Sequence, residues 1–258
     1  MKPTVAVHKF SSCDGCQLAF INAGEDLLTL SNLVDIVHFA EAGPVEAEAR
    51  VDIAFVEGSI TTPGDRDRIQ RIRDNSQYLV TIGACATSGG LQALRNLANT
   101  DGWVRAIYAR PEYINTLSTS TAIRDHVVVD LELWGCPVNG KQVLQVVRDL
   151  LFGVAPRNDA DKVCLDCKRH HNICVMVTRG IPCMGPVTRT GCGAICPQLG
   201  RDCYACYGPA ENINTDSFSR RLEGFGLLPE DIAKRFLFIN NHAPEFLAAA
   251  EELNDPAE

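Results

Sequence analysis

The stretch Thr4-Val5-Ala6-Val7-His8-Lys9-Phe10-Ser11-Ser12-Cys13-Asp14-Gly15-Cys16 joins a short apolar run to a loop that carries a Cys-x-x-Cys pair. Further apolar runs of the same kind follow along the chain. Runs like these, rich in β-branched residues, are typical of strands that are buried on both faces of a sheet. The sequence therefore predicts strands at Thr4–Val7, Val34–Phe39, Val51–Val56, Tyr78–Ile82 and Val127–Leu133.

Helical patterns lie between these predicted strands. Thr62 and Pro63 supply an N-cap and a first-turn proline ahead of a helix at Arg66–Arg73. Lys141–Phe152 is amphipathic, and Gly153 fits a C-cap position after it. Strands that alternate with helices predict a parallel sheet with helices on both of its faces. We therefore expect a flavodoxin-like α/β domain over residues 1–155.

The character of the sequence changes after Pro156. Residues 160–209 hold eight cysteines, six glycines and four prolines, with almost no hydrophobic periodicity. A segment of this composition needs bound metal to organise it. Helical patterns return near the end, at Asp216–Phe225, Pro229–Arg235 and Pro244–Leu253. Residues 156–258 are therefore expected to form an irregular metal-binding domain with C-terminal helices.

Composition and charge exclude several classes of protein. The formal net charge of −8 argues against a nucleic-acid partner, which would require clustered Lys and Arg. No apolar run approaches the roughly 18 residues of a membrane span. The start of the sequence lacks the apolar core of a signal peptide, so we expect a cytoplasmic protein. Reducing compartments keep thiols reduced, and the 12 cysteines therefore indicate metal or redox sites rather than disulfides.

A first group of cysteines follows the predicted strands and consists of Cys13, Cys16, Cys85 and Cys136. Open α/β sheets bind ligands beyond the carboxyl ends of their strands, where these four thiols would converge. Four thiolates suit zinc or an iron–sulfur cluster. A flavin or nucleotide is the alternative use of this edge. However, no G-x-G-x-x-G follows any predicted strand, as a dinucleotide site would require.

The remaining cysteines divide into two groups of four. They are Cys164, Cys167, Cys174 and Cys183, then Cys192, Cys196, Cys203 and Cys206. Each group contains one Cys-x-x-Cys pair, a feature that zinc ribbons share with iron–sulfur sites. Proline follows both Cys136 and Cys196, as it does in ferredoxin cysteine runs. The spacing therefore favours iron–sulfur clusters over zinc.

Short motifs around the cysteines match those of a known family. They are Cys13–Cys16, Val56–Ile60, Gly83–Ala86 and Gly135–Pro137 in the first domain, and Pro182–Thr188, Gly191–Gly193 and Asp202–Cys206 in the second. Over nearly its whole length the chain resembles the small, electron-transferring subunit of nickel–iron hydrogenases. The resemblance implies that the Cys13 group holds the proximal cluster, the Cys192 group the medial cluster and the Cys164 group the distal cluster.

Two cysteine positions indicate which subgroup of the family the chain resembles most. Cys164 stands where the respiratory members of the family have a histidine, and Cys196 adds a fourth medial cysteine where they have three. The resemblance therefore implies three 4Fe–4S clusters. It is closest to the delta subunit of sulfhydrogenase-type, NAD(P)-linked enzymes, and small subunits of viologen-reducing or deazaflavin-reducing hydrogenases are the alternatives. The implied partners are a nickel–iron large subunit and an iron–sulfur, FAD- and NAD(P)-binding electron-acceptor subunit.

The same resemblance implies no catalytic residue in this chain. Cys203 and Cys206 are followed by Tyr207-Gly208, without the histidine that ends a nickel-binding pair. We therefore expect an electron-relay subunit of a hydrogenase oxidoreductase. The cluster-bearing subunit of respiratory complex I shares the first domain, but it uses adjacent cysteines, and this sequence contains no Cys-Cys pair.

Other interpretations stay open at this point. A zinc-organised interaction module and an independent ferredoxin-like carrier are hypotheses from different classes. Glu57 ends a predicted strand beside the proximal site. It would either take part in a proton path or have a purely structural role as a hydrogen-bonded carboxylate. The run Lys168-Arg169-His170-His171 in the distal loop would compensate cluster charge, dock an electron acceptor, or simply be solvated.

Overall fold

The computed structural model describes residues 2–156 and 161–254. Its parallel sheet has five strands in the order β2-β1-β3-β4-β5. The strands are β1 (Thr4–Lys9), β2 (Asp35–Phe39), β3 (Val51–Glu57), β4 (Ser76–Ile82) and β5 (Leu131–Leu133). This 2-1-3-4-5 order is flavodoxin-like, with a topological switch point between β1 and β3. The predicted fold class is confirmed.

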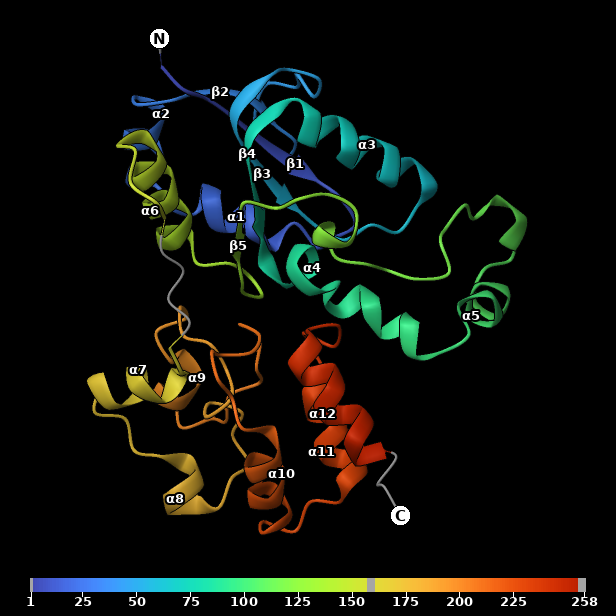
Figure 1. The fold of residues 1–258 in the computed structure, drawn as a ribbon, viewed down its shortest axis with the longest axis vertical. Helices are drawn as coiled ribbons and strands as arrows, with labels where there is room; N and C mark the ends of the chain where they lie inside the picture. The colour runs from blue at the N-terminus through green and yellow to red at the C-terminus, as the bar shows by residue number, and fades with distance from the viewer. Residues whose placement is uncertain (1, 157–160, 255–258) are drawn as a thin grey trace.

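Helices cover both faces of the sheet (Figure 1). On one face lies α3 (Pro63–Asp74), which begins at the Thr62 capping box and buries Ile69 and Ile72. The other face is covered by α1 (Gly15–Ile21), α2 (Glu25–Ser31) and α6 (Gly140–Leu151). The amphipathic pattern of α6 explains its position, because its apolar side packs into the same core as Val5 and Val7 of β1.

The last strand is shorter than the sequence predicts. A strand was expected over Val127–Leu133, whereas β5 covers Leu131–Leu133 only, and a short 3₁₀ helix, η3, occupies Ile123–Asp125. The Asp130 carboxylate accepts a hydrogen bond from the Leu79 N–H at 2.7 Å. The Asp130 N–H still donates to the Leu79 carbonyl at 3.0 Å, but the Leu79 N–H donates to a side chain and not to a backbone carbonyl. The regular register with β4 therefore begins at Leu131.

The connection between β4 and β5 contains helices that the sequence patterns do not predict. They are α4 (Gly83–Ser88), the 3₁₀ helix η1 (Gly90–Leu97), α5 (Thr100–Ile107) and the 3₁₀ turn η2 (Pro111–Tyr113). The first of them begins directly at the carboxyl end of β4. Figure 1 shows η1 and α5 running away from the sheet.

The second part of the chain combines short helices with a helical core. The cysteine-rich segment contains α7 (Val163–Arg169), α8 (Val175–Arg179) and α9 (Ile195–Gln198), and the end of the chain forms α10 (Thr215–Glu223), α11 (Pro229–Phe236) and α12 (Pro244–Asn254). Phe236 contacts the rings of Phe218 and Phe246 at centroid distances of 6.1 and 5.5 Å. Val175 and Met184 from the cysteine-rich segment pack into this core. The C-terminal helices therefore support the segment that has little hydrophobic periodicity of its own.

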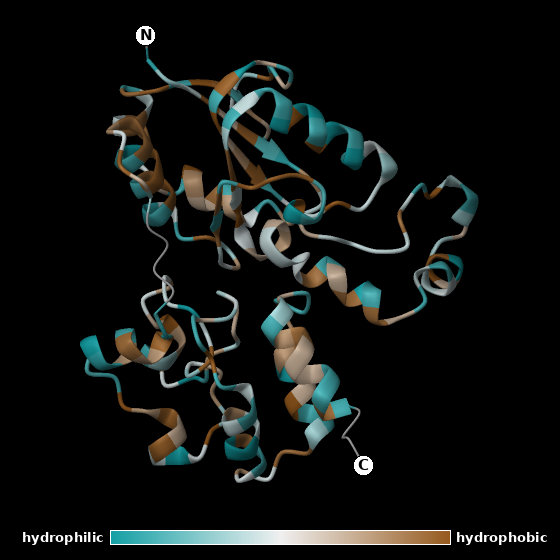
Figure 2. Ribbon diagram, in the orientation of Figure 1, coloured by the Kyte–Doolittle hydropathy of each residue, from teal (hydrophilic) through white to brown (hydrophobic). Residues whose placement is uncertain are grey.

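Single polar bonds and one tryptophan join the two parts. Ser88 Oγ donates to Asn240 Oδ1 at 2.9 Å, Asn241 Nδ2 donates to the Gly90 carbonyl at 3.0 Å, and Trp134 packs into the core of the second part. Figure 2 shows the hydrophobic residues concentrated along the sheet strands and on the paired C-terminal helices. Within the ranges 2–156 and 161–254, no helix has the length and apolar character that a membrane crossing requires.

Candidate metal centres

The first group of cysteines lies at the carboxyl edge of the sheet. Cys13 precedes α1, Cys16 lies in its first turn, Cys85 lies in α4 after β4, and Cys136 follows β5. Gly83 allows the closest approach, because a Cβ atom there would lie 2.3 Å from the Cys16 Sγ, and its φ of +86° favours glycine. The fold therefore gathers these four cysteines from three separate segments that follow strands β1, β4 and β5.

The environment of the first group of cysteines disfavours thiolates that bind no metal. Burial, together with the nearby thiols of Cys136 and Cys13, raises the pKa of Cys85 to about 12, and its Sγ donates to Gln92 Oε1 at 3.2 Å. Burial and the carboxylate of Glu57 also raise the pKa of Cys16. Thiolates are the species that bind metals, so a positively charged metal group would offset this desolvation and mutual repulsion.

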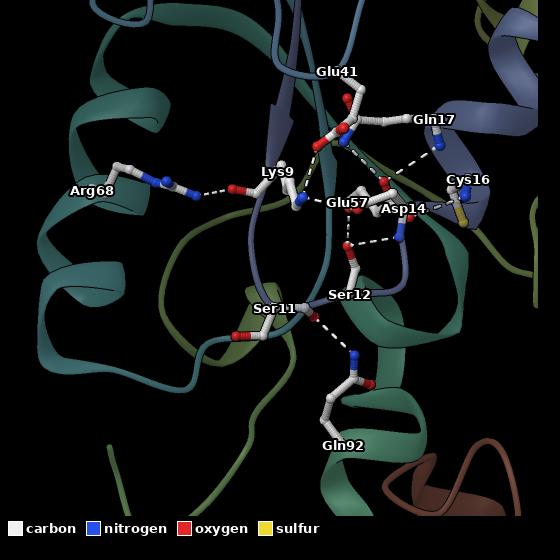
Figure 3. A network of polar contacts seen from close by, with 10 residues as sticks. All are labelled: Lys9, Ser11, Ser12, Asp14, Cys16, Gln17, Glu41, Glu57, Arg68 and Gln92. Atoms are coloured by element: carbon white, nitrogen blue, oxygen red, sulfur yellow. Dashed lines mark hydrogen bonds and ion pairs between the residues drawn. The ribbon is translucent and has the colours of Figure 1, made fainter. Parts of the chain in front are cut away.

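Glu57 fixes the orientation of the loop that carries Cys13 and Cys16 (Figure 3). Only 2% of this residue is exposed, and its carboxylate accepts from the Cys16 N–H at 3.0 Å and from Gln17 Nε2 at 3.0 Å. Burial raises the pKa of Glu57, although these hydrogen bonds oppose the shift. The contacts fit the structural role that the sequence left open for this carboxylate, and its part in a proton path stays a prediction.

A second set of bonds holds the same loop from outside. Lys9 Nζ contacts Asp14 Oδ2 at 2.8 Å and Glu41 Oε1 at 2.6 Å, and Ser12 Oγ donates to Asp14 Oδ1 at 3.0 Å (Figure 3). Asp14 has a φ of +63°, which turns the chain between the two cysteines. The loop is thus anchored at both ends by bonds from the protein itself.

The second group surrounds a cavity. Cys164 and Cys167 lie on α7, Cys174 precedes α8, and Cys183 follows it. All four line a cavity of about 140 Å³ together with Gly185. Burial, with the three other thiols of the group, raises the pKa of Cys164 to about 11. A cavity of this volume accommodates a group the size of benzene, which is larger than a single metal ion.

The third group lies around α9 and the loop that follows it. It consists of Cys192, Cys196, Cys203 and Cys206. Burial raises the pKa of Cys206 to about 12, and the thiols of Cys192, Cys136 and Cys196 contribute. Burial also raises the pKa of Cys203, with contributions from the thiols of Cys183 and Cys206. Across the described parts of the chain, no three His, Cys, Asp or Glu side chains are arranged to hold a single metal ion.

Contacts join the third group to each of the other two. Cys206 lies near Cys136 of the first group, and the Cys203 N–H donates to the Cys183 Sγ of the second group at 3.2 Å. The three groups therefore form a series in which the Cys192 group connects the other two.

Tyr207 fills the space between the first and third groups. A Cβ atom on Gly135 would lie 2.9 Å from its Cζ, and one on Gly191 would lie 2.8 Å from its Cε1. Its hydroxyl donates to the Pro137 carbonyl at 3.3 Å. Each of the two glycines directly precedes a cysteine, so the ring packs against the backbone of both cysteine loops.

Comparison with known proteins places the chain in a family. A family model described as the NADH ubiquinone oxidoreductase, 20 Kd subunit, matches residues 13–150. Sulfhydrogenase 2 subunit delta from Pyrococcus furiosus is 32% identical over 232 residues, which cover 90% of this chain and 96% of that relative. The chain belongs to this family, as a small subunit of the nickel–iron hydrogenase type. The predicted family resemblance is confirmed.

Other relatives of this hydrogenase small subunit have names that refer to different electron acceptors. A subunit of the F420-non-reducing hydrogenase vhu from Methanocaldococcus jannaschii is 27% identical, over 80% of this chain and 82% of that relative. NAD-reducing hydrogenase HoxS subunit delta from Cupriavidus necator is 28% identical, over 59% of this chain and 80% of the relative. All three relatives are subunits of hydrogenases, so the chain is part of an oxidoreductase complex.

A solved structure shares the fold of the hydrogenase small subunit. The actinobacterial-type NiFe-hydrogenase from Ralstonia eutropha H16 matches with a TM-score of 0.57 and 17% identity, over 98% of this chain and 90% of that chain. At this identity the likeness shows the fold alone. It extends across both parts of the chain, whereas the family model ends at residue 150.

Sequence reasoning missed two residues that shape the candidate metal centres. Tyr207 was noted only as the residue that follows a cysteine pair, and Gln92 was not noted at all. Glycines directly before Cys136 and Cys192 were a signal for close packing at these loops. Nothing in the spacing identified the aromatic ring that packs against them.

Proposed function

We propose that this small subunit holds three 4Fe–4S clusters and relays electrons between a nickel–iron large subunit and a flavin- and NAD(P)-binding partner. The observation that carries the proposal is the series of cysteine groups, each of four thiols, joined by direct contacts. In this proposal the first group is proximal, the Cys192 group medial and the Cys164 group distal. Each bound cluster would accept and release one electron at a time.

The residues of the chain fit this cofactor. The distal cavity has cysteine sulfur on its lining and room for a multi-atom group. At the proximal site, Gly83 brings the backbone close to the Cys16 thiol, where a backbone N–H can donate to cluster sulfur. Glu57 and Lys9 hold the cysteine loop in position. These residues would orient the ligands, and none of them supplies a catalytic centre.

The number of cysteines indicates which subunit would carry the catalytic centre. All 12 cysteines are assigned to clusters, so the proposal leaves the chain no thiol for a nickel–iron centre, and catalysis would lie on the large subunit. The proposed units are residues 1–155 for the proximal cluster and residues 156–258 for the other two. We also propose a cytoplasmic location, because reducing compartments keep cysteine thiols available for cluster ligation.

The proposed acceptor rests on the relatives. Sulfhydrogenase subunit delta matches nearly the whole chain, and the HoxS subunit belongs by name to an NAD-reducing enzyme. A partner that binds iron–sulfur clusters, FAD and NAD(P) is therefore our first candidate. A viologen- or deazaflavin-linked enzyme is the second candidate. Coenzyme F420 is a deazaflavin, and the similarity to a coenzyme F420 hydrogenase subunit gamma supports the deazaflavin-linked form.

Hydrogen-dependent reduction tests the function. The complex is purified anaerobically through a tag on this chain, and reduction of NAD⁺, NADP⁺ and methyl viologen by dihydrogen is measured. We expect reduction of the dye and of one nicotinamide, and loss of both with Cys136→Ser. Ser31→Ala, at an exposed position in α2, is the control and should retain both. A complex that reduces none of the acceptors under dihydrogen contradicts the proposal.

A further inference from the structure

A groove lies directly beside the distal cysteines. It has a volume of about 500 Å³, and its lining includes His171, Asn172, Ile173, Arg179, Gln198 and Gly200. Asn172 and Pro197 line both this groove and the cavity that the distal cysteines surround. The groove and the cavity are therefore separated by only the thickness of these side chains. Cys174 is itself exposed, so this is a place where the distal site approaches the surface.

Exposed apolar side chains lie on and around the groove. Ile173 is 74% exposed and lines it, and Leu199, which is 73% exposed, lies between two lining residues. Val177 on α8 is also exposed. Apolar side chains grouped in this way, next to a hollow, are typical of surfaces that bind another protein.

The exposed charges of this region are basic. Lys168 and Arg169 end α7, and Arg179 ends α8. The imidazoles of His170 and His171 follow directly after α7. The neighbouring acid Asp166 is mostly covered and pairs with Arg169 at 3.4 Å. The chain as a whole has a formal net charge of −8, so the charge of this surface is opposite in sign to the net charge of the molecule. It favours partners with an acidic face over a second copy of this chain that docks through the same basic surface.

We propose that the groove and its basic rim form the docking surface for an acidic electron-carrying protein or subunit. The inference rests on the proposed function, because it assigns the partner that would take electrons at the distal site. Opposite charges would steer the partner toward the surface and speed association, and the apolar side chains would be buried once it has docked.

Electron transfer to two soluble carriers of opposite charge tests the proposal. The full chain, reconstituted anaerobically with iron and sulfide and reduced with dithionite, is freed of excess dithionite. It is then mixed with an oxidised acidic plant-type ferredoxin or with basic cytochrome c. One electron passes from the reduced chain to the carrier, and the second-order rate is followed in stopped flow at low and at high ionic strength.

Three variants separate the contributions. Arg169→Glu/Arg179→Glu reverses two charges at the surface, and Leu199→Ser removes an apolar contact. Arg220→Glu/Lys234→Glu makes the same charge change at exposed positions on α10 and α11. The iron content of every variant is measured first, so that a variant that has lost its clusters is recognised.

We expect Arg169→Glu/Arg179→Glu to slow transfer to ferredoxin about tenfold at low ionic strength, and Leu199→Ser to slow it at both. In 1 M salt the Debye length falls to about 3 Å, so the charge effect should disappear. Transfer to cytochrome c should not slow. An equal loss in the Arg220→Glu/Lys234→Glu control, or no loss in any variant, overturns the docking surface.

Two further outcomes also overturn it. Self-association of the chain that Arg169→Glu/Arg179→Glu abolishes would assign the surface to a second copy, and salt-sensitive binding of RNA there would assign it to a nucleic acid. If the reconstituted wild-type chain contains no iron, the proposed function itself is contradicted. If the wild-type chain binds iron but the substitutions do not change its transfer rates, only the proposed docking surface is contradicted.

Discussion

Replacing Tyr207 tests the packing between the first and third cysteine groups. The ring is buried, with 5% of the residue exposed, between the backbones of Gly135 and Gly191. Tyr207→Phe removes only the hydroxyl and its 3.3 Å bond to the Pro137 carbonyl, so we expect a loss of about 1 kcal/mol in the free energy of unfolding. Tyr207→Ala removes the whole ring and should cost about 3–5 kcal/mol. The neighbouring glycines have no side chains with which to fill the space.

The assay is anaerobic denaturation of the iron-loaded chain, followed by circular dichroism and by cluster absorbance. Tyr113→Ala is the control, because Tyr113 is 74% exposed and its loss should change stability by less than about 0.5 kcal/mol. In the folded variants, paramagnetic coupling between reduced clusters is recorded and should change in Tyr207→Ala but not in Tyr207→Phe. Equal stability of the Ala and Phe variants would refute the packing described for this ring.

Four other perturbations have defined outcomes. Cys164→Ser should lower iron from about twelve to about eight atoms per chain and retain hydrogen-dependent dye reduction while blocking the natural acceptor; unchanged acceptor reduction contradicts the distal assignment. Gly83→Ala places a methyl group 2.3 Å from the Cys16 Sγ at a φ of +86°, so iron at the proximal site should be lost, with backbone strain of about 1–2 kcal/mol; wild-type iron content would show that the loop can move. Glu57→Gln turns an amide donor toward N–H donors and should lower the free energy of unfolding by about 1–3 kcal/mol; an unchanged denaturation midpoint argues against the role given to this carboxylate. Burial lowers the pKa of His8 in the folded chain to about 3. As the pH falls below about 6.5, His8 is therefore protonated in the unfolded chain but not in the folded chain, and the free energy of unfolding should drop by about 2 kcal/mol at pH 5. His8→Gln should remove that part of the pH dependence.

The regular elements could be predicted because burial imposes a pattern on the sequence. The strand at Val51–Val56 and the helix at Lys141–Phe152 were recognised from apolar runs and helical periodicity, and both were located to within one residue. The last strand was predicted too long, because the Asp130 side chain interrupts the ladder and periodicity does not report such bonds. The helices between β4 and β5 were missed because they are short and partly 3₁₀.

The cysteine groups were predictable from spacing, but the contacts between the groups were not. Cysteines that follow strands of one parallel sheet converge for topological reasons. The approach of Cys206 to Cys136 depends on how the second part of the chain packs on the first. That packing includes individual polar bonds such as Asn139 Nδ2 to the Gly191 carbonyl at 2.7 Å. Bonds of this kind involve single residues and leave no periodic signal in the sequence.

Metal and sulfide analysis of anaerobically purified chain tests the central proposal most directly. With four thiolates for each 4Fe–4S cluster, we predict about twelve iron atoms and as many acid-labile sulfides per chain. Dithionite reduction should then give paramagnetic signals from interacting clusters. Colourless protein with about three zinc atoms, one for each group of four thiolates, or protein with no iron or sulfide, would contradict the account.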